Sequence, residues 1–434
     1  MDSKEFSVRI SPASEPIRGE VRISGDKSVS IRRALFSLLG SQTVSLKNYG
    51  TGHDCLTALS CLRTLGIPVL SDGRNVVIHR GTVQSGVTLD CQNSGTTARL
   101  LVGMLAGREG NWTLVGDESL SKRPMRRVAV PLSRMGAEIE LSESGCLPAK
   151  IVGQKLRGTE VDLNIASAQI KSALLLAGLS ASGVTRIREP FNSRDHTERL
   201  LGLRQDEDRF WTVSRQTLLS KPLDLSGEVP GDISSAAFWV VAALLVPQSE
   251  LTIGNVLLNP LRARWFECLR RSGADISAAV EGNVCGEPVG RITARYSRMM
   301  PLKVTADEVP GLIDEIPALA VLAATIEGRS EFYNIGELRV KESDRLQAVA
   351  SGLETMGVSV EINGDDLFVN GGSPLRGGVI DPAGDHRIAM AFSLAALTAR
   401  SQTDILNASC AAVSYPEFYD ELAKLSPDAG IQKY

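Results

Sequence analysis

The chain has 434 residues, more than one ordinary hydrophobic core accommodates, so we expect two or three domains. Its formal net charge of −3 and its lack of long basic runs argue against a general binder of nucleic acids or membranes. Seven scattered cysteines without a CxxC pair, and no apolar run long enough to span a membrane, predict a soluble cytoplasmic protein with reduced thiols.

Six segments along the chain share one pattern, a short polar opening followed by a helix rich in Ala, Leu and Val. They begin at Gly25, Asn93, Ser167, Gly231, Asp314 and Gly384. Successive starts lie about 64 to 83 residues apart, which is too long for a solenoid repeat. The spacing therefore predicts a small α/β unit that is repeated six times.

Strands and a second kind of helix are predicted between these openings. The clearest strands are Asn75–His79, Val87–Asp90, Trp112–Val115, Lys150–Val152, Val358–Ile362 and Leu367–Asn370. Four further helical patterns each end at a glycine that is expected to cap the helix and lead into a strand, namely Gly66, Gly136, Gly273 and Gly357. Three such units would make one domain of about 200 residues.

The helix openings have the character of anion sites. A helix N-terminus offers unpaired N–H groups and the positive end of the helix dipole. N-capping explains the Ser, Thr and Asp residues there, but not the nearby cations Lys27, Arg32, Arg99 and Arg387. Two basic clusters, residues 122–127 and 339–345, lie between openings and favour a site for a pair of multiply anionic ligands over a solvated face.

Other phosphate and metal motifs are absent. The GDKS stretch at Gly25 lacks the earlier glycine of a P-loop, since that position is Glu20, and GTGHDC breaks the GxGxxG pattern. The four histidines show no metal-ligand spacing. These observations argue against an NTPase, a dinucleotide enzyme and a metalloenzyme.

Ten motifs occur in order along nearly the whole chain: GDKSVSIRRAL, NSGTTARLL, KRPM, SAQIKSALLLAGL, SRDHTERLL, PGDISSAAF, DEIPALA, RVKESDRL, GDHRIAMA and SYPEF. Together they resemble the enolpyruvyl transferase family, in particular the branch that acts on shikimate 3-phosphate. The resemblance implies an α/β (α+β) fold of two similar globular domains, each of three βαβαββ units, with the active site in the interdomain cleft. It places residues 1–23 and 228–434 in one domain and residues 24–227 in the other.

The activity that the resemblance implies is transfer of the enolpyruvyl group of phosphoenolpyruvate to the 5-hydroxyl of shikimate 3-phosphate. Phosphate leaves by addition and elimination through a tetrahedral ketal, on the route to chorismate and the aromatic amino acids. No metal or organic cofactor is implied. The expected partners are the two small-molecule substrates alone, without nucleic acid or membrane, and a monomer is the default.

The resemblance also assigns residues. Lys27 would assist proton transfer, Asp314 would be the base for the 5-hydroxyl, and Glu342 would handle the C3 proton. Shikimate 3-phosphate would contact Lys27, Ser28, Arg32, Ser167, Gln169, Ser193, Arg194, Asp314 and Lys341. Phosphoenolpyruvate would contact Lys27, Gly95, Thr96, Arg123, Gln169, Glu342, Arg345, His386 and Arg387. The plainer alternative makes Asp314 and Ser167 ordinary N-caps and Glu342 half of a surface ion pair.

The chain departs from the family pattern in three places. Val413 stands where many relatives have a lysine that contacts phosphoenolpyruvate, and Ala168 replaces a common serine. The segment 202–212 is shortened, which leaves its packing open. Gly95 is retained, and because a side chain there would crowd the phosphoenolpyruvate pocket, we expect ordinary sensitivity to glyphosate.

Three other interpretations are weaker. The sister transferase that acts on UDP-N-acetylglucosamine usually has Asn where this chain has Ser28, and commonly a loop cysteine that ESLSKRPMRR lacks. RNA 3′-phosphate cyclases share a related repeat, but they use ATP and a histidine nucleophile, and the ten motifs do not match them. A catalytically silent binder of phosphorylated metabolites is favoured only by Val413, and turnover would distinguish it.

Overall fold

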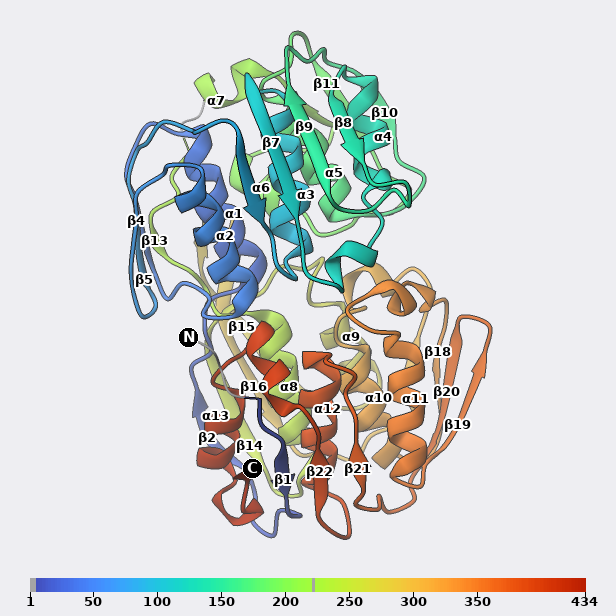
Figure 1. The fold of residues 1–434 in the computed structure, drawn as a ribbon. Coiled ribbons are helices and arrows are strands. Elements are labelled where there is room, and N and C mark those ends of the chain that lie inside the picture. The colour runs from blue at the N-terminus through green and yellow to red at the C-terminus, as the bar shows by residue number, and fades with distance from the viewer. Residues whose placement is uncertain (1–4, 221–222) are drawn as a thin grey trace. The chain divides into compact units, whose positions relative to one another are not determined.

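The computed structural model describes residues 5–220 and 223–434, and its contacts divide the chain into two compact units (Figure 1). Unit 1 comprises the chain up to Ser24, Pro230–Gly282 and Pro288–Tyr434, and unit 2 comprises Gly25–Val229 and Asn283–Glu287. These limits lie close to the expected domain boundaries, except that Asn283–Glu287 belongs to unit 2. There the buried Glu287 carboxylate lies 2.6 Å from Nδ1 of His196. That each unit is an independent domain stays a prediction.

Unit 2 contains three sheets and seven α-helices within its described residues. The sheets are β13 (Gly227–Glu228), β3 (Val44–Lys47), β5 (Asn75–Ile78), β4 (Val69–Asp72); then β6 (Val87–Asp90), β7 (Gly110–Val115), β9 (Ala149–Gly153), β8 (Glu138–Leu141); and β10 (Glu160–Asp162), β11 (Thr185–Arg188), β12 (Trp211–Val213). The helices are α1 (Lys27–Phe36), α2 (His53–Thr64), α3 (Gly95–Ala106), α4 (Arg126–Arg134), α5 (Ala168–Gly178), α6 (His196–Leu201) and α7 (Arg215–Ser220).

Unit 1 also contains three sheets, with six α-helices in the part that the structure describes. The sheets are β15 (Asp275–Val284), β16 (Glu287–Arg295), β14 (Glu250–Leu257), β2 (Arg18–Val21); then β17 (Lys303–Val304), β18 (Gly328–Phe332), β20 (Asp366–Gly371), β19 (Ser359–Asn363); and β21 (Val379–Ile380), β22 (Thr403–Ile405), β1 (Val8–Ile10), β23 (Gln432–Lys433). The helices are α8 (Ile233–Leu245), α9 (Arg264–Arg271), α10 (Ile316–Thr325), α11 (Arg345–Thr355), α12 (His386–Ala396) and α13 (Phe418–Leu425).

The predicted sixfold repeat and the α/β class are confirmed by the sheet topology. Every sheet has one parallel pair of strands, such as β6 with β7 or β17 with β18, next to antiparallel partners. The chain does not keep each repeat contiguous. β2 pairs in parallel with β14, more than 200 residues later, and β3 pairs in parallel with β13.

The six opening helices form the cores of the units because they are apolar on most sides. All thirteen residues of α8 are buried, and α8, α10 and α12 pack together in unit 1. In unit 2, α3 packs closely on α5, and a Cβ atom at Gly103 would lie 2.2 Å from the Ala173 carbonyl oxygen. No helix in the described ranges is long and apolar enough to cross a membrane.

The four predicted glycine caps are also confirmed. Gly66, Gly136, Gly273 and Gly357 follow α2, α4, α9 and α11 and have φ values of 83°, 92°, 92° and 83°. After each glycine, the next N–H donates back to a carbonyl of the last turn, as Ile67 does to Leu62. Glycine is favoured here because an L side chain rarely adopts this left-handed conformation.

The shortened segment 202–212 forms a tight connection into β12. Gly202 caps α6 at φ 68°, and the Phe210 N–H donates to the Asp206 carboxylate over 2.8 Å. The Phe210 ring is stacked by two guanidinium groups, those of Arg186 at 4.1 Å and Arg188 at 4.5 Å from the ring centroid. The packing of this segment, which the sequence left open, is therefore provided in part by cation–π contacts.

Candidate active site

Four of the six helix openings are closed by their own side chains, and two are not. Asp26, Ser94, Asp232 and Asp385 cap α1, α3, α8 and α12, each by accepting a hydrogen bond from a backbone N–H of the first turn. Ser167 stands at the N-cap of α5 without a side-chain cap bond, and Asp314 precedes Glu315, the N-cap residue of α10. Capping therefore does not account for Ser167 or Asp314.

In unit 2, Lys27 at the start of α1 is held by an acid that sequence reasoning missed. Its Nζ lies 3.0 Å from Oδ2 of Asp54, which is in the first turn of α2. The side chains are 19% and 8% exposed, so the pair is largely withdrawn from water while the ammonium stays reachable. The ion pair holds the lysine side chain in a defined direction.

Arg32 lies one turn further along α1 and is almost completely buried. Its guanidinium donates to the hydroxyl of Thr197 on α6 at 2.9 Å, to Ser172 on α5 at 3.3 Å and to the Ser28 carbonyl at 3.1 Å. The structure thus brings Ser28 and Arg32 together with two further hydroxyl residues from other helices.

The residues expected around phosphoenolpyruvate in unit 2 converge on the opening of α3. Gln169 donates to the Thr96 hydroxyl at 3.0 Å and accepts from Arg99 at 2.8 Å. Arg123 donates to the Asn93 side chain at 2.8 Å. Arg99 and Asn93 were expected at this helix opening but neither was assigned to a substrate, although both lie in the NSGTTARLL motif. A Cβ atom at Gly95 would lie 2.5 Å from Nη1 of Arg99, so a side chain there would displace this guanidinium.

The other expected residues of unit 2 follow β11. Ser193 is buried and its hydroxyl donates to Glu189 at 2.6 Å, and Arg194 comes next in the chain.

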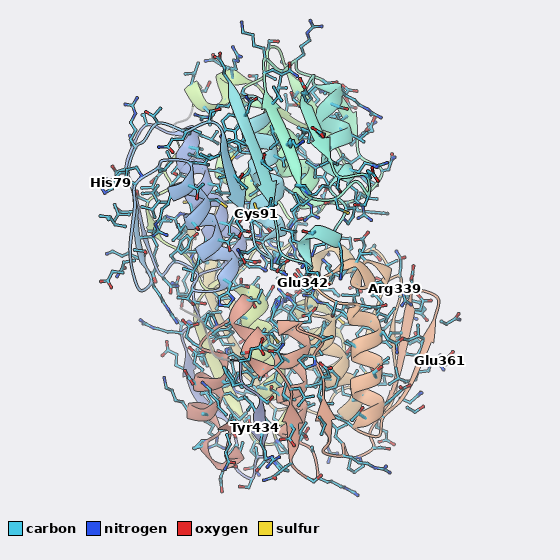
Figure 2. The ribbon with its side chains drawn as sticks, viewed as in Figure 1. His79, Cys91, Arg339, Glu342, Glu361 and Tyr434 are labelled. Atoms are coloured by element: carbon cyan, nitrogen blue, oxygen red, sulfur yellow. The ribbon has the colours of Figure 1, made fainter. Side chains whose placement is uncertain are left out.

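In unit 1, one buried guanidinium organises the expected residues. Arg345, at the start of α11, is 1% exposed and lies 2.7 Å from Asp385, 3.2 Å from Asp314 and 2.5 Å from Glu342. Burial alone would lower the pKa of Arg345, but these three carboxylates raise it above its ordinary value. Glu342 lies in the loop that leads into α11 (Figure 2). Because its carboxylate is paired with a buried arginine, it is not half of a surface ion pair.

Lys341 and Arg387 complete this unit 1 group. Lys341 Nζ lies 3.5 Å from the Asp314 carboxylate, and Arg387 donates to the Asp314 carbonyl at 2.9 Å. His386 is buried beside them, with Nδ1 4.0 Å from Asp385. The Asp314 carboxylate thus lies within 4.0 Å of three cations, those of Lys341, Arg345 and Arg387.

The two basic clusters contain both surface pairs and residues of the groups described above. Lys122 forms an exposed pair with Glu118, and Arg339 pairs with Asp344 at 3.3 Å on the surface. Arg123, Lys341 and Arg345, the members expected to contact substrate, belong to the groups described above.

No set of three or more His, Cys, Asp or Glu side chains suited to a metal ion occurs in residues 5–220 and 223–434. All seven cysteines are free thiols.

Comparison with solved structures shows to which class of protein the fold belongs. The fold matches EPSP synthase from Acinetobacter baumannii with a TM-score of 0.84 and 36% identity, over 99% of this chain and 100% of that chain. It also matches the enolpyruvyl transferase NikO from Streptomyces tendae with a TM-score of 0.76, at 20% identity, over 99% of both chains. The architecture is that of an enolpyruvyl transferase.

The family follows from sequence. The family model described as EPSP synthase (3-phosphoshikimate 1-carboxyvinyltransferase) matches residues 12–422. Curated proteins named 3-phosphoshikimate 1-carboxyvinyltransferase are 44% identical in Synechococcus sp. (strain RCC307) and 45% identical in Salinibacter ruber, each over 94% of this chain and 97% of the relative. The chain belongs to the EPSP synthase family.

Substitution of Asp385 by Asn should lower stability in a pH-dependent way. Burial raises the pKa of Asp385, but the Arg345 guanidinium outweighs it and holds the pKa below its ordinary value. The ionised form is therefore favoured in the folded state, so its contribution is full above about pH 4 and is lost as the pH falls through the lower folded value. We expect Asp385→Asn to lower the free energy of unfolding by about 2 kcal/mol at pH 7.

Urea denaturation from pH 7 to pH 3 measures this effect. The difference in free energy of unfolding between Asp385→Asn and the unmodified protein should be constant down to pH 5 and should become smaller below about pH 4. Asp72→Asn, on the exposed strand β4, is the control and should change little. A constant difference at every pH would show that the charge of Asp385 is not the cause.

Proposed function

We propose that the chain catalyses transfer of the enolpyruvyl group of phosphoenolpyruvate to the 5-hydroxyl of shikimate 3-phosphate, with release of phosphate. Family membership over residues 12–422 carries this proposal. It is supported by the chemical fit of the two groups of residues, since each substrate bears a phosphate and a carboxylate. Planar guanidinium groups bind both kinds of anion through paired hydrogen bonds.

The roles assigned to single residues are part of the proposal. In the addition step, the 5-hydroxyl oxygen forms a bond to C2 of phosphoenolpyruvate, Asp314 accepts the hydroxyl proton, and C3 gains a proton. In the elimination step, C3 loses a proton and the C2–O bond to phosphate breaks. Lys27 and Glu342 exchange the C3 proton, and the contacts of Asp314 with Lys341 and Arg345 hold its carboxylate in a defined position for its role as base.

The cations act on the phosphate groups. Arg123, Arg345 and Arg387 bind phosphoenolpyruvate and stabilise the charge on the departing phosphate. In the structure Arg345 and Arg387 are already paired with carboxylates, at 2.7 Å to Asp385 and 3.6 Å to Glu315. A substrate phosphate would share these guanidinium groups, so the protein carboxylates set their orientation in advance.

In this proposal, the group of residues around Lys27 and the group around Arg345 act on the same pair of substrates. Shikimate 3-phosphate is bound by three serines and four longer polar residues, namely Ser28, Ser167, Ser193, Arg32, Arg194, Gln169 and Lys341. Phosphoenolpyruvate is bordered by Gly95, Thr96 and His386. The protein works as a cytoplasmic monomer with these small molecules as its only partners.

Phosphate release tests the reaction and its base together. Incubation with both substrates should release phosphate, and omission of either should abolish release. Asp314→Asn keeps the side-chain shape but removes the base, so kcat should fall by about 10²-fold or more. Asp275→Asn, on exposed strand β15 of the same unit, is the matched control and should retain full activity.

Two results would contradict the proposal. If both substrates bind but no phosphate appears, the chain is a silent binder. If neither binds while UDP-N-acetylglucosamine does, it has the activity of the sister transferase.

The loss of the usual cation at Val413 should weaken phosphoenolpyruvate binding. Val413 ends a 3₁₀ helix, Ala408–Val413, and its side chain is half-buried. Val413→Lys should lower the KM for phosphoenolpyruvate by about threefold to tenfold, because one charged contact is worth roughly 1 kcal/mol. Val413→Met has similar length without charge and should leave this KM unchanged. An equal effect of both variants would mean that charge at this position is unimportant.

Glyphosate should inhibit the unmodified enzyme. The reason is Gly95, whose lack of a side chain leaves Arg99 and Arg123 in place at the opening of α3. Steady-state inhibition against phosphoenolpyruvate measures this expectation, and an enzyme indifferent to millimolar glyphosate would refute it.

A further inference from the structure

A second group of charges in unit 2 is not used by the proposed chemistry. Lys171 on α5 is fully buried, and its Nζ lies 2.6 Å from Glu189 and 3.0 Å from Glu198, both also buried. The Trp211 ring closes another side, with its centroid 5.4 Å from Nζ. We call Lys171, Glu189 and Glu198 the buried triad. A charge withdrawn from water in this way is costly unless it is closely paired, so the arrangement calls for a reason.

The triad holds Ser193 by all of its polar groups. Glu189 accepts from the Ser193 N–H at 2.9 Å and from its hydroxyl at 2.6 Å. Lys171 donates to the Ser193 carbonyl at 3.4 Å. A serine held at three points has a fixed position, and so has the start of the backbone that continues to Arg194.

The charge of Lys171 also serves the triad. A lone ionised Glu189 beneath Ser193 would repel a phosphate, and Lys171 offsets this negative charge. Burial by itself would lower the pKa of Lys171, but the two glutamates raise it, so the ammonium stays charged. Burial raises the pKa of Glu198 above its ordinary value and outweighs the opposite effect of Lys171, and the nearby Asp195 raises it further.

We propose that the buried triad is a positioning unit, which fixes Ser193 and thereby sets the course of the backbone that carries Arg194 to the phosphate of shikimate 3-phosphate. The proposal rests on the function proposed above, from which the role of Arg194 is taken. It assigns no chemical step to Lys171, Glu189 or Glu198, which act only through the residues that they hold. Loss of the triad should therefore weaken binding of shikimate 3-phosphate while phosphoenolpyruvate and the chemical step are little affected.

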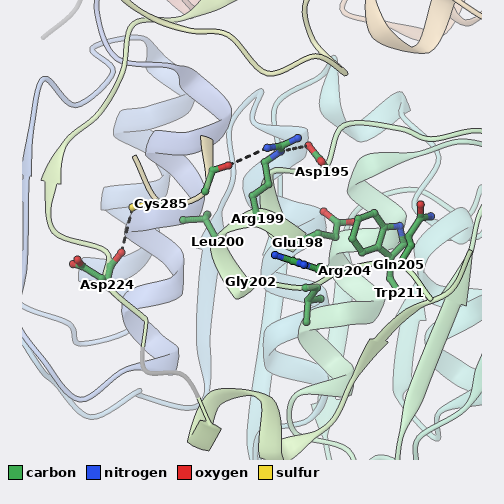
Figure 3. Close-up of a pocket in the computed structure, with 12 residues that line it drawn as sticks. Asp195, Glu198, Arg199, Leu200, Gly202, Arg204, Gln205, Trp211, Asp224 and Cys285 are labelled. Atoms are coloured by element: carbon green, nitrogen blue, oxygen red, sulfur yellow. Dashed lines mark hydrogen bonds and ion pairs between the residues drawn. The ribbon is translucent and has the colours of Figure 1, made fainter. Parts of the chain in front are cut away.

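A pocket beside the triad allows a sharp test. It has a volume of about 680 Å³ and is lined by Glu198 and Trp211, together with Arg199, Leu200, Arg204 and others (Figure 3). Glu189 does not line it. If Glu198 is shortened, a small carboxylate can enter from the pocket and take its place beside Lys171. Because Glu189 does not line the pocket, we expect no such replacement at its position.

The experiment compares Glu198→Ala with Glu189→Ala by steady-state kinetics. Both variants should raise the KM for shikimate 3-phosphate about tenfold, with kcat and the KM for phosphoenolpyruvate changed less than twofold. Acetate or formate at tens of millimolar should restore the KM of Glu198→Ala but not that of Glu189→Ala. The unmodified enzyme with acetate, and both variants with chloride at equal ionic strength, are the controls.

Several outcomes would overturn the proposal. One is an unchanged KM for shikimate 3-phosphate in Glu198→Ala. Another is a rise in KM that is equal for shikimate 3-phosphate and phosphoenolpyruvate. A third is failure of acetate to lower the KM of Glu198→Ala for shikimate 3-phosphate. Should Glu198→Ala fail to fold, Glu198→Gln keeps the side-chain volume, and an unchanged KM there would count equally against the proposal.

Direct binding separates this proposal from the proposed function. If the unmodified protein binds shikimate 3-phosphate in calorimetry but shows no turnover, the proposed catalytic function is refuted. The triad proposal is then tested by the dissociation constants of the same variants for shikimate 3-phosphate. If it turns over normally and the variants bind shikimate 3-phosphate as the unmodified protein does, only the triad proposal fails.

Discussion

A positive charge that is withdrawn from water must be balanced close by, and much of unit 1 is arranged around this requirement at Arg345. Its guanidinium is 1% exposed and meets three carboxylates from three segments, Asp314, Glu342 and Asp385. The same aspartate that caps α12 therefore also anchors the start of α11. The Arg345 guanidinium is therefore held in place by the protein's own carboxylates before any ligand arrives.

Unit 2 meets the same requirement with separate pairs. Lys27 is balanced by Asp54, and Lys171 by two glutamates, whereas Arg32 is surrounded by neutral hydroxyl and carbonyl oxygens. The hydrogen bonds of Arg32 tie α1 to α5 and α6, whereas the carboxylate of Asp54 ties α1 to α2 through the Lys27 ammonium. The two units thus anchor their buried cations with different kinds of partner.

Local pattern predicted the repeat, and the repeat predicted most of the fold. The helix openings and the four capping glycines depend on neighbouring residues, which is why the sequence located them within a residue or two. The pairing of β2 with β14 and of β13 with β3 joins segments far apart in the chain. No local signal specifies such pairings, and the family resemblance supplied only the expected domain boundaries, not the pairs of strands.

The site divides in the same way. Most expected residues were found beside one another within their own unit, because motifs of consecutive residues carried them. Asp54, Asp385 and Glu189 were missed because their importance arises from a partner elsewhere in the chain. Lys122 and Arg339 form ion pairs on the surface, and a run of cations in sequence does not reveal such partners.

The order of strands in the sheets has a consequence for synthesis on the ribosome. The sheet of β3, β4 and β5 lacks its edge strand until Gly227–Glu228 has been made, so unit 2 can close its described sheets about halfway through translation. Unit 1 cannot, because β1 pairs with β22 and with β23 at the end of the chain. β1 is synthesised well before its partners β22 and β23, and during that interval its apolar residues Val8 and Ile10 remain without their native partners, as potential clients for a chaperone.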